Sequence, residues 1–258
     1  MKYFTNISHE FRTPLTMIYG ATRMLRGSES DGETGNLLNI ISQNANRMLK
    51  LVNQILDFNK MENGILKLKV TEVDAVPVLN NTINRFAVGF KQKQISVQCF
   101  TQDSEMLMPL DVDKFDKILT NLVSNALKYS PEESSIKIDM AFVDKTSVET
   151  LFADSSGIDS DSWLKVVVAD TGIGIPKDKQ KAVFERFYQI EHSTRQSTWG
   201  TGIGLFYTQQ LVNLHYGFIK CESNTPKGTV FTFVLPQNIE LYKDFIDNTN
   251  ESPMDDII

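Results

Sequence analysis

Two stretches with helical apolar periodicity near the N-terminus most constrain what this chain can fold into. Apolar side chains recur at spacings of three and four over residues 2 to about 26 and again from about 36 to 61, which predicts two long helices. The polar residues 27–35 between them are few, so the helices should pair as an antiparallel hairpin. One hairpin cannot bury both stripes, and we therefore expect a homodimer through residues 1–62 in which two hairpins form a four-helix bundle. The alternative is a hairpin that folds onto the following domain of the same chain.

The apolar period changes at residue 65, where strand-like runs begin to alternate with helical patterns. Asp74 and Asp111 precede two of these helical patterns and are candidate N-caps, and a third helix opens after Gly200. The expected strands cover residues 65–70, 95–100, 136–143, 164–169, 218–221 and 229–235. This order predicts an α/β two-layer sandwich, a mixed sheet with helices on one face.

The same patterns divide the chain into three parts. We expect a helical hairpin over residues 1–64, an α/β domain over 65–236, and a polar tail over 237–258 that is typical of a linker. The polar and acidic segment 144–162 interrupts the α/β domain as a hairpin excursion or insertion, and we assign it no role.

Composition excludes several classes of protein. A net charge of −6 and a pI near 5.2 argue against a nucleic-acid partner. Cys99 and Cys221 form neither a metal-binding spacing nor a disulfide framework, which favours a reducing compartment. No apolar run approaches the roughly 20 residues that span a bilayer. Met1 is followed at once by helix interior, so we expect a fragment of a longer protein.

Two glycine clusters predict a phosphate-binding region. Gly172 and Gly174 follow a strand, and the segment 200–204 precedes a helix. Glycines at a helix N-terminus expose backbone amides and the positive end of the helix dipole, which together cradle phosphate. Neither cluster is a Walker A loop or a dinucleotide fingerprint, and each alone is also compatible with ordinary turns.

Three polar side chains mark one face of an otherwise apolar helix. Asn121 and Asn125 are four residues apart, and Lys128 follows three residues later. Amide oxygens and an ammonium suit a hydrated Mg²⁺ ion and triphosphate oxygens. The alternative is a pair of asparagines that cap the helix or face solvent.

One histidine near the N-terminus is a candidate nucleophile. His9 stands beside Glu10 in an apolar-periodic helix, and Pro14 should kink that helix about one turn later. The alternative is an ordinary helix histidine that makes a structural contact.

Together these motifs resemble the sensor histidine kinases of two-component systems, with a phosphoacceptor hairpin followed by an ATP-binding domain of the gyrase, Hsp90 and MutL type. Residues 8–14 are similar to the H-box of that family. The other conserved boxes follow it in the same order as in the family. The similar segments are 121–129 for the N-box, 170–174 for the G1 box, 184–188 for the F-box, 200–204 for the G2 box and 228–229 for the last glycine turn. Two segments depart from the family pattern, His215-Tyr216-Gly217 after the third helix and Pro226-Lys227-Gly228 before the last strand.

The resemblance implies ATP and Mg²⁺ as cofactors. Asp170 would accept the adenine amino group, Asn125 with Asn121 would hold Mg²⁺, Lys128 would meet phosphate, and Tyr129 would lie against adenine. Residues 177–200 would form a lid. The complete implied nucleotide-binding set is Asn121, Asn125, Lys128, Tyr129, Asp170, Gly172, Gly174, Gly200, Gly202, Gly204 and Thr229.

The resemblance also implies the reaction. His9 would attack the γ-phosphorus of ATP while Glu10 fixes the tautomer of the imidazole. The phosphoryl group would pass to an aspartate of a response-regulator receiver domain, in cis or in trans, and Glu10 with Thr13 resembles the pair that removes it from the receiver. The fragment would be the cytoplasmic portion of a membrane-anchored sensor, in contact with the membrane only through segments absent here, and its tail leaves room for a receiver, as in hybrid kinases. The rival interpretations are a nucleotide-binding dimeric scaffold without phosphotransfer and an ATPase of the gyrase and Hsp90 type.

Overall fold

The structure is a computed structural model, and it describes residues 15–22, 24–25, 34–38, 40–42, 44–45, 48–49, 52, 66–190 and 202–245. The chain divides into two compact units. The hairpin unit comprises residues 1–66 and 185–204, and the sheet unit comprises residues 67–184 and 205–258. Across the described residues, no helix combines the length and apolar character needed to cross a membrane.

The hairpin unit carries the two predicted helices. All described residues between 15 and 25 and between 34 and 52 are helical. Two apolar side chains, Ala21 and Leu37, are buried. Other large apolar side chains are exposed in the single chain: Leu15, Met17, Tyr19, Met24, Leu38, Ile40, Leu49 and Val52. His9, Glu10, Thr13 and the predicted kink at Pro14 lie outside the described residues.

The sheet unit is built on a mixed five-stranded sheet with the order β2-β4-β5-β7-β6. Its strands are β2 (Ser96–Thr101), β4 (Ser135–Asp144), β5 (Ser162–Asp170), β6 (Phe218–Ser223) and β7 (Thr229–Pro236). Strand β2 runs parallel to β4, and the other neighbours are antiparallel. β5 is central, and its even-numbered residues Leu164, Val166 and Val168 are buried, as a strand covered by a helical layer requires.

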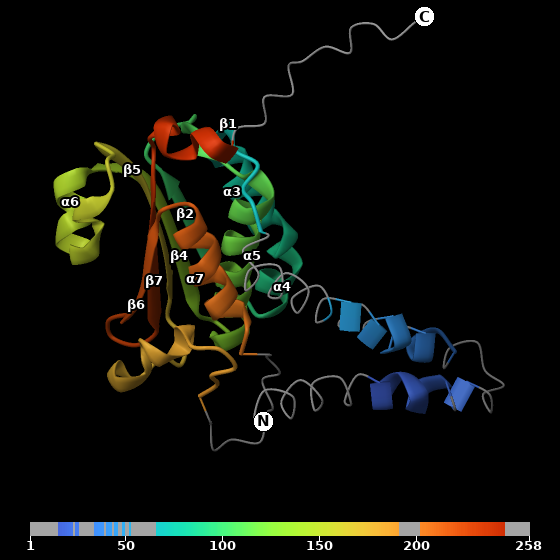
Figure 1. Ribbon diagram of the computed structural model, residues 1–258. Coiled ribbons are helices and arrows are strands. Elements are labelled where there is room, and N and C mark those ends of the chain that lie inside the picture. Colours follow the sequence, from blue (N-terminus) through green and yellow to red (C-terminus); the bar gives the residue numbers. More distant parts are fainter. Residues whose placement is uncertain are drawn as a thin grey trace, which may run out of the picture. The chain divides into compact units, whose positions relative to one another are not determined.

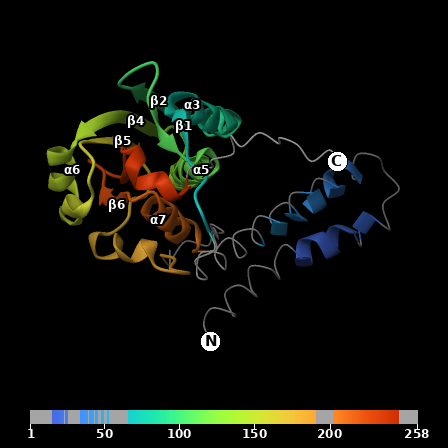
Figure 2. The same ribbon diagram turned by 45° about the horizontal axis from the view of Figure 1, so that its top comes forward.

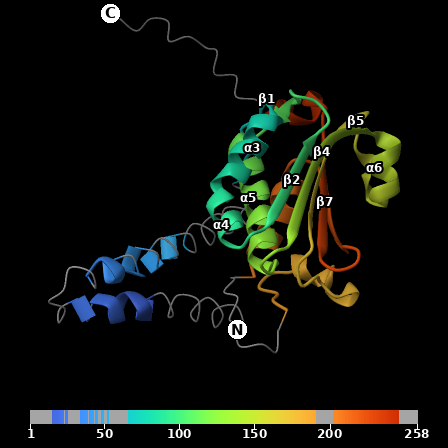
Figure 3. The same ribbon diagram turned by 180° about the vertical axis from the view of Figure 1, so that it is seen from behind.

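Three longer helices cover that face of the sheet, as Figures 1 and 3 show from opposite sides: α3 (Ala75–Arg85), α5 (Val112–Tyr129) and α7 (Gly204–Leu214). Phe115 of α5 packs edge-on against Phe233 of β7, with ring centroids 6.2 Å apart. Burial of such aromatic pairs is a main source of stability between layers. The predicted fold class, a helical hairpin followed by an α/β sandwich with a mixed sheet, is confirmed for the described residues.

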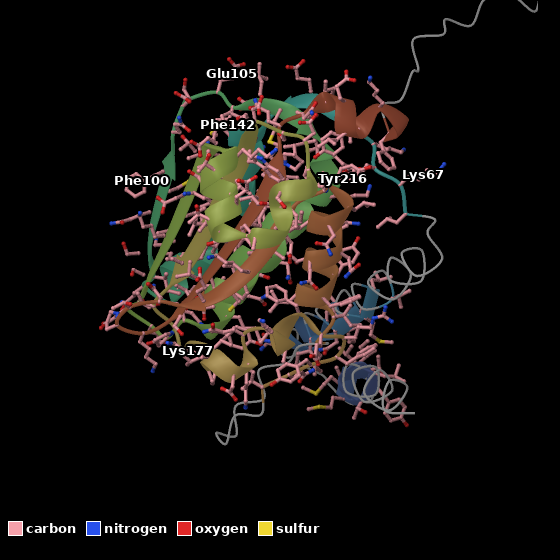
Figure 4. All side chains as sticks on the ribbon, turned by 60° about the vertical axis from the view of Figure 1, so that its left-hand side comes forward. Lys67, Phe100, Glu105, Phe142, Lys177 and Tyr216 are labelled. Carbon is pink, nitrogen blue, oxygen red and sulfur yellow. The ribbon has the colours of Figure 1, made fainter. Side chains whose placement is uncertain are left out.

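The acidic segment 144–162 folds over the opposite face of the sheet. It forms α6 (Lys145–Leu151) and the 3₁₀ helix η1 (Ala153–Gly157); Figure 2 shows α6 on the side of the strands away from α5 and α7, and Figure 4 brings that side forward. Val148 of α6 packs with Trp163 and Val234, and all three are fully buried. The indole Nε1 of Trp163 donates to the carbonyl of Ser160 at 2.9 Å. The segment therefore closes one end of the open sheet face, whereas Phe100 at the β2 edge is more than half exposed (Figure 4).

Two expected elements differ in the structure. The strand predicted over 65–70 lies later in the chain, as β1 (Thr71–Asp74), and it pairs with β3 (Leu107–Leu110), which the sequence analysis did not predict. The reason is a tertiary contact, because the β1–β3 pair is a separate two-stranded sheet formed by segments far apart in the chain. The helix expected after Asp74 breaks at Phe86 into α3 and α4 (Ala87–Gln92), although Asp74 does cap α3 by accepting from the Val76 amide.

The predicted linker-like tail is wrong in its first part. Residues Ile239–Phe245 form the 3₁₀ helix η4, and Tyr242 within it is fully buried. Tyr242 packs on Leu68 and Val70, and the Val70 amide donates to the Phe245 carbonyl at 3.3 Å. This segment therefore packs on the sheet unit as part of its core and is not a linker. The remainder of the tail lies outside the described residues.

Candidate nucleotide-binding site

Helix α5 carries the predicted amide and ammonium groups. Asp111 caps its N-terminus by accepting from the Lys114 amide at 3.0 Å. Burial acts to raise the pKa of Asp111, but hydrogen bonds from the Lys114 side chain and from the Lys69 and Lys114 amides outweigh it, so the pKa lies below its ordinary value. The carboxylate therefore fixes both the start of α5 and the incoming chain at Lys69, whose amide donates at 2.8 Å.

The two asparagines of α5 differ in what they contact. The Asn121 Nδ2 donates to the hydroxyl of Thr208 on α7 at 2.8 Å, which leaves its carbonyl oxygen for another partner. Asn125 is half-buried, and no partner for its side-chain amide exists among the described residues. An amide oxygen without a protein partner can act as a ligand of Mg²⁺ or accept a hydrogen bond from a water bound to that ion.

Lys128 and Tyr129 end the helix side by side. The Lys128 Nζ donates to the Tyr129 hydroxyl at 3.0 Å and lies 4.7 Å from the centroid of the tyrosine ring. Lys128 also has a further interaction. This pairing presents one positive charge and one aromatic ring together at the last turn of α5.

Asp170 ends the central strand and is almost completely buried. Its Oδ1 accepts from the Gly172 amide at 2.8 Å and from the Thr229 amide at 3.2 Å. The register explains the second bond, because Asp170 and Thr229 are direct partners in the β5–β7 pairing. Burial raises the pKa of Asp170, and the two amide bonds oppose that rise. Neither amide bond uses Oδ2, so this oxygen remains able to accept from a ligand donor.

Close backbone packing around Asp170 requires glycine at two positions. A Cβ at Gly172 would come within 2.6 Å of the Tyr129 carbonyl oxygen, and a Cβ at Gly228 within 1.9 Å of the Asp170 carbonyl oxygen. Gly228 also has a φ of +122°, which L side chains rarely adopt. The structure therefore brings Asp170, Gly172, Thr229 and the end of α5 into one cluster. Gly174 joins it through Gly228, whose carbonyl oxygen lies 3.1 Å from the place of a Gly174 Cβ.

The predicted lid, residues 177–200, is described only over residues 177–190, and the description resumes at Gly202. Within the hairpin unit the Phe187 amide donates to the Gly202 carbonyl at 2.9 Å, and a Cβ at Gly202 would lie 2.6 Å from the Phe187 backbone. Gly202 has a φ of +67°, and Gly204 is the first residue of α7. Residue Gly200 lies outside the described residues, so its predicted contact with phosphate stays a prediction.

Sequence analysis missed two residues that support the cluster. Thr208 accepts from Asn121, and the Asn224 side chain donates to the Asp170 carbonyl at 2.8 Å. Nothing in the sequence around Thr208 marks it. Asn224 stands just before the Thr225–Gly228 turn, which leads into β7 beside Asp170, so a correct strand register would have pointed to it.

The residues present fit ATP and Mg²⁺. A buried carboxylate with one unused oxygen can accept from the amino group of an adenine base, and backbone packing at Gly172 leaves no room for a side chain. No group of three or more His, Cys, Asp or Glu residues that could hold a metal exists in the described part of the chain. The amide oxygens of Asn121 and Asn125 are available as Mg²⁺ ligands beside phosphate oxygens and water.

Comparisons with known families agree with this geometry. Residues 110–239 match the family described as histidine kinase-, DNA gyrase B-, and HSP90-like ATPase. Residues 2–64 match the His kinase A (phospho-acceptor) domain. The two matches cover the sheet unit from the start of α5 and the helical hairpin.

Individual proteins show the same similarity. The chain is 31% identical over 256 residues to the hybrid signal transduction histidine kinase D of Dictyostelium discoideum, covering 97% of this chain and 16% of that protein. It is 31% identical over 246 residues to the sensor histidine kinase WalK of Bacillus subtilis, covering 95% of this chain and 38% of that protein. The chain thus spans well under half the length of these relatives.

A solved structure shares the fold. The histidine kinase ThkA, crystallised in complex with the response regulator protein TrrA, aligns with a TM-score of 0.65 at 23% identity. The alignment covers 93% of this chain and 62% of that one. At this identity the likeness establishes the fold.

Proposed function

The chain belongs to the histidine kinase family, and from this premise we propose that it uses ATP to phosphorylate its own His9 and then passes the phosphoryl group to an aspartate of a receiver domain. The observation that carries the proposal is the Asp170 cluster. One carboxylate oxygen is fixed by the Gly172 and Thr229 amides, and the other remains for an adenine amino group.

The base would be recognised by a charge-assisted hydrogen bond. The N6 amino group of adenine donates to Asp170 Oδ2, and its geometry is set before the ligand arrives because Oδ1 is already held by two amides. A guanine base presents a carbonyl oxygen at the corresponding position, and two acceptors would face each other. The site therefore selects adenine over guanine.

The phosphate end would be held by α5 and the glycine-rich segment before α7. Asn125, with Asn121, would hold Mg²⁺, which when bound supplies positive charge to the phosphate oxygens. Lys128 would add a second positive charge, and Gly200, Gly202 and Gly204 would let backbone amides approach the phosphates.

The chemical step is an in-line displacement. The neutral imidazole nitrogen of His9 attacks the γ-phosphorus, the bond from that phosphorus to the bridging oxygen breaks, and ADP leaves. The proton on the other ring nitrogen stays hydrogen-bonded to Glu10, which stabilises the charge that develops on the ring. Glu10 and Thr13, three residues apart, would also orient water for hydrolysis of the phosphorylated receiver.

The partners follow from the same scheme. The exposed apolar side chains of the helical residues, among them Tyr19 at 67% and Leu49 at 60% exposure, favour a homodimer through residues 1–62. A receiver domain, in the same polypeptide or separate, would accept the phosphoryl group, as the complex of ThkA with a response regulator illustrates for that kinase. The whole protein would be a membrane-anchored sensor whose kinase part lies in the cytoplasm.

Labelling with γ-³²P ATP and Mg²⁺ tests the proposal. We expect acid-labile, base-stable label on the protein, and loss of that label in His9→Gln. His192→Gln is the matched control, because His215 is fully buried and its replacement would disturb the fold. Nucleotide binding without label would indicate a scaffold, and release of free phosphate without label would indicate an ATPase. Either outcome would overturn the phosphotransfer proposal.

A further inference from the structure

The C-terminal carbonyls of α5 share one unusual partner, the side chain of Lys93. This lysine is the C-cap residue of α4, and its Nζ donates to the carbonyl oxygens of Leu127 at 2.8 Å, Ser130 at 2.8 Å and Lys128 at 3.3 Å. A helix leaves its last carbonyls without helical partners. A single ammonium, which has three donors and no acceptor, therefore satisfies three of them.

The other carbonyls of this turn are also accounted for. Ala126 accepts from the Ser130 amide at 3.1 Å, and Tyr129 accepts from the Ile173 amide at 3.2 Å. The Tyr129 carbonyl is thus the one carbonyl of this turn that bonds to the segment after Asp170. It is also the atom within 2.6 Å of a Cβ placed at Gly172. The position of the α5 end therefore determines how closely the base-binding turn can approach.

Close approach of α4 to α5 allows Lys93 to reach these atoms. A Cβ at Gly89, one turn earlier in α4, would come within 2.8 Å of a Leu127 methyl group. Lys93 is fixed on its backbone as well, because its carbonyl accepts from the Glu133 amide at 3.0 Å. The next residue, Gln94, has a φ of +54° and turns the chain into β2.

The charge of Lys93 favours the same arrangement. A helix C-terminus carries partial negative charge, so a cation there stabilises the last turn. Lys128, Tyr129 and the Tyr129 carbonyl all belong to this turn, and they belong to the proposed nucleotide site. Lys93 itself need not touch the ligand.

We propose that Lys93 is a positioning residue for the base-binding side of the nucleotide site. Its ammonium fixes the last turn of α5, which in turn fixes Tyr129 against Gly172 and leaves Asp170 Oδ2 aligned for an adenine amino group. This inference rests on the proposed function, and it adds a residue far from the known motifs, 28 positions before Asn121, to the machinery that discriminates adenine from guanine.

Calorimetric titration of the full chain with ATP and with GTP, each with Mg²⁺, tests the inference. In Lys93→Met we expect ATP affinity to fall about tenfold while GTP affinity changes little. The dissociation constant for GTP divided by that for ATP should therefore fall about tenfold. Lys93→Arg, which keeps the charge and several donors, should recover ATP affinity to within about threefold of the original. Lys91→Met is the matched control, because Lys91 lies on the same helix with an exposed side chain, and it should behave like the original protein.

Urea unfolding of each variant separates positioning from stability. If Lys93→Met lowers the unfolding midpoint but leaves the ATP to GTP ratio unchanged in the fully folded range, the inference is wrong and Lys93 is only structural. The inference is also wrong if Lys93→Met and Lys91→Met bind ATP equally well. If the original protein binds neither nucleotide, the proposed function fails first, and that result is distinct from the other two.

Discussion

The hydroxyl of Tyr242 donates to the backbone carbonyl of His215 at 2.8 Å and thereby joins η4 to the end of α7. Both residues are fully buried. We expect Tyr242→Phe to lower the free energy of unfolding by about 1–2 kcal/mol, because a buried carbonyl loses its partner. Urea denaturation measures the change. Tyr188→Phe, at a half-buried tyrosine whose hydroxyl has no partner among the described residues, should leave the midpoint unchanged, and an equal effect of both substitutions would contradict the assignment.

The buried His215 predicts a pH dependence of stability. Burial lowers its pKa from the ordinary 6.5 to about 4. Its Nδ1 lies 2.8 Å from the Leu211 carbonyl and so carries the proton, while Nε2 is buried without a partner in the described structure. Between pH 6.5 and 4 the unfolded chain binds a proton that the native protein does not. Stability is therefore complete above pH 6.5 and falls by about 3 kcal/mol as the pH drops through this window.

Comparison with His215→Gln isolates that titration, because all other ionisable groups are common to both proteins. The variant should be less stable at pH 7.5 but should lose less further stability down to pH 4.5. Denaturation curves at several pH values give the free energy of unfolding of each protein as a function of pH. An equal pH dependence in the two proteins would show that a group other than His215 titrates in this window.

Asp170→Asn should remove adenine recognition without unfolding the protein. The new amide can still present an oxygen to the Gly172 and Thr229 amides, but its nitrogen would face the donor amino group of adenine. We expect ATP affinity to fall at least about 100-fold. Because burial raises the pKa of Asp170, removing its charge should cost little stability. Asp139→Asn on β4 serves as the control, and titration calorimetry as the measurement.

Asn125→Ala should abolish labelling of the protein at physiological Mg²⁺ concentration. The variant lacks the one amide of α5 whose side chain has no partner in the described structure, so it would lose an oxygen ligand for the metal. Raising the Mg²⁺ concentration should restore part of the labelling. Asn81→Ala, at an exposed position of α3, should label normally. Normal labelling of Asn125→Ala would refute the assignment of the metal to this residue.

The exposed apolar residues of the hairpin predict a dimer that charge can disrupt. Leu38, Leu49 and Val52 are spaced by 11 and 3 residues and so lie on one helix face. Leu49→Glu should weaken the dimer at least about tenfold, and Asn36→Glu, at an exposed polar position two residues before Leu38 and on the opposite helix face, should not. Light scattering of the full chain at several concentrations gives the masses. A monomer of 29.2 kDa in the original protein would contradict the proposal.

Local chemistry made several elements predictable. Asp74 and Asp111 were identified as helix caps from their positions alone, and both side chains accept the expected backbone amides. The apolar run over residues 164–169 predicted a strand, and β5 lies there with one face buried under helices. In each case a short-range pattern and the tertiary structure demand the same conformation.

The missed features depend on contacts between distant segments. β3 contains Pro109 and forms through pairing with β1, 36 residues earlier. Tyr242 is buried because the incoming chain at Leu68 and Val70 lies beside it. Thr208 and Lys93 act through partners more than 30 residues away. No local pattern in the sequence encodes such neighbours, whereas the glycine and Asp170 motifs are dense enough in one segment to stand out.

The hydrogen bond from the Val70 amide to the Phe245 carbonyl has a consequence for how this domain can be combined with others. The first and the last described segments of the sheet unit therefore lie side by side, an arrangement that tolerates insertion of a domain into another protein. The sheet unit can be placed between two segments of a host protein without separating them. Any module joined after Phe245 would start beside residues 68–70, and a displacement of either segment would reach the other through this hydrogen bond and through the packing of Tyr242 on Leu68 and Val70.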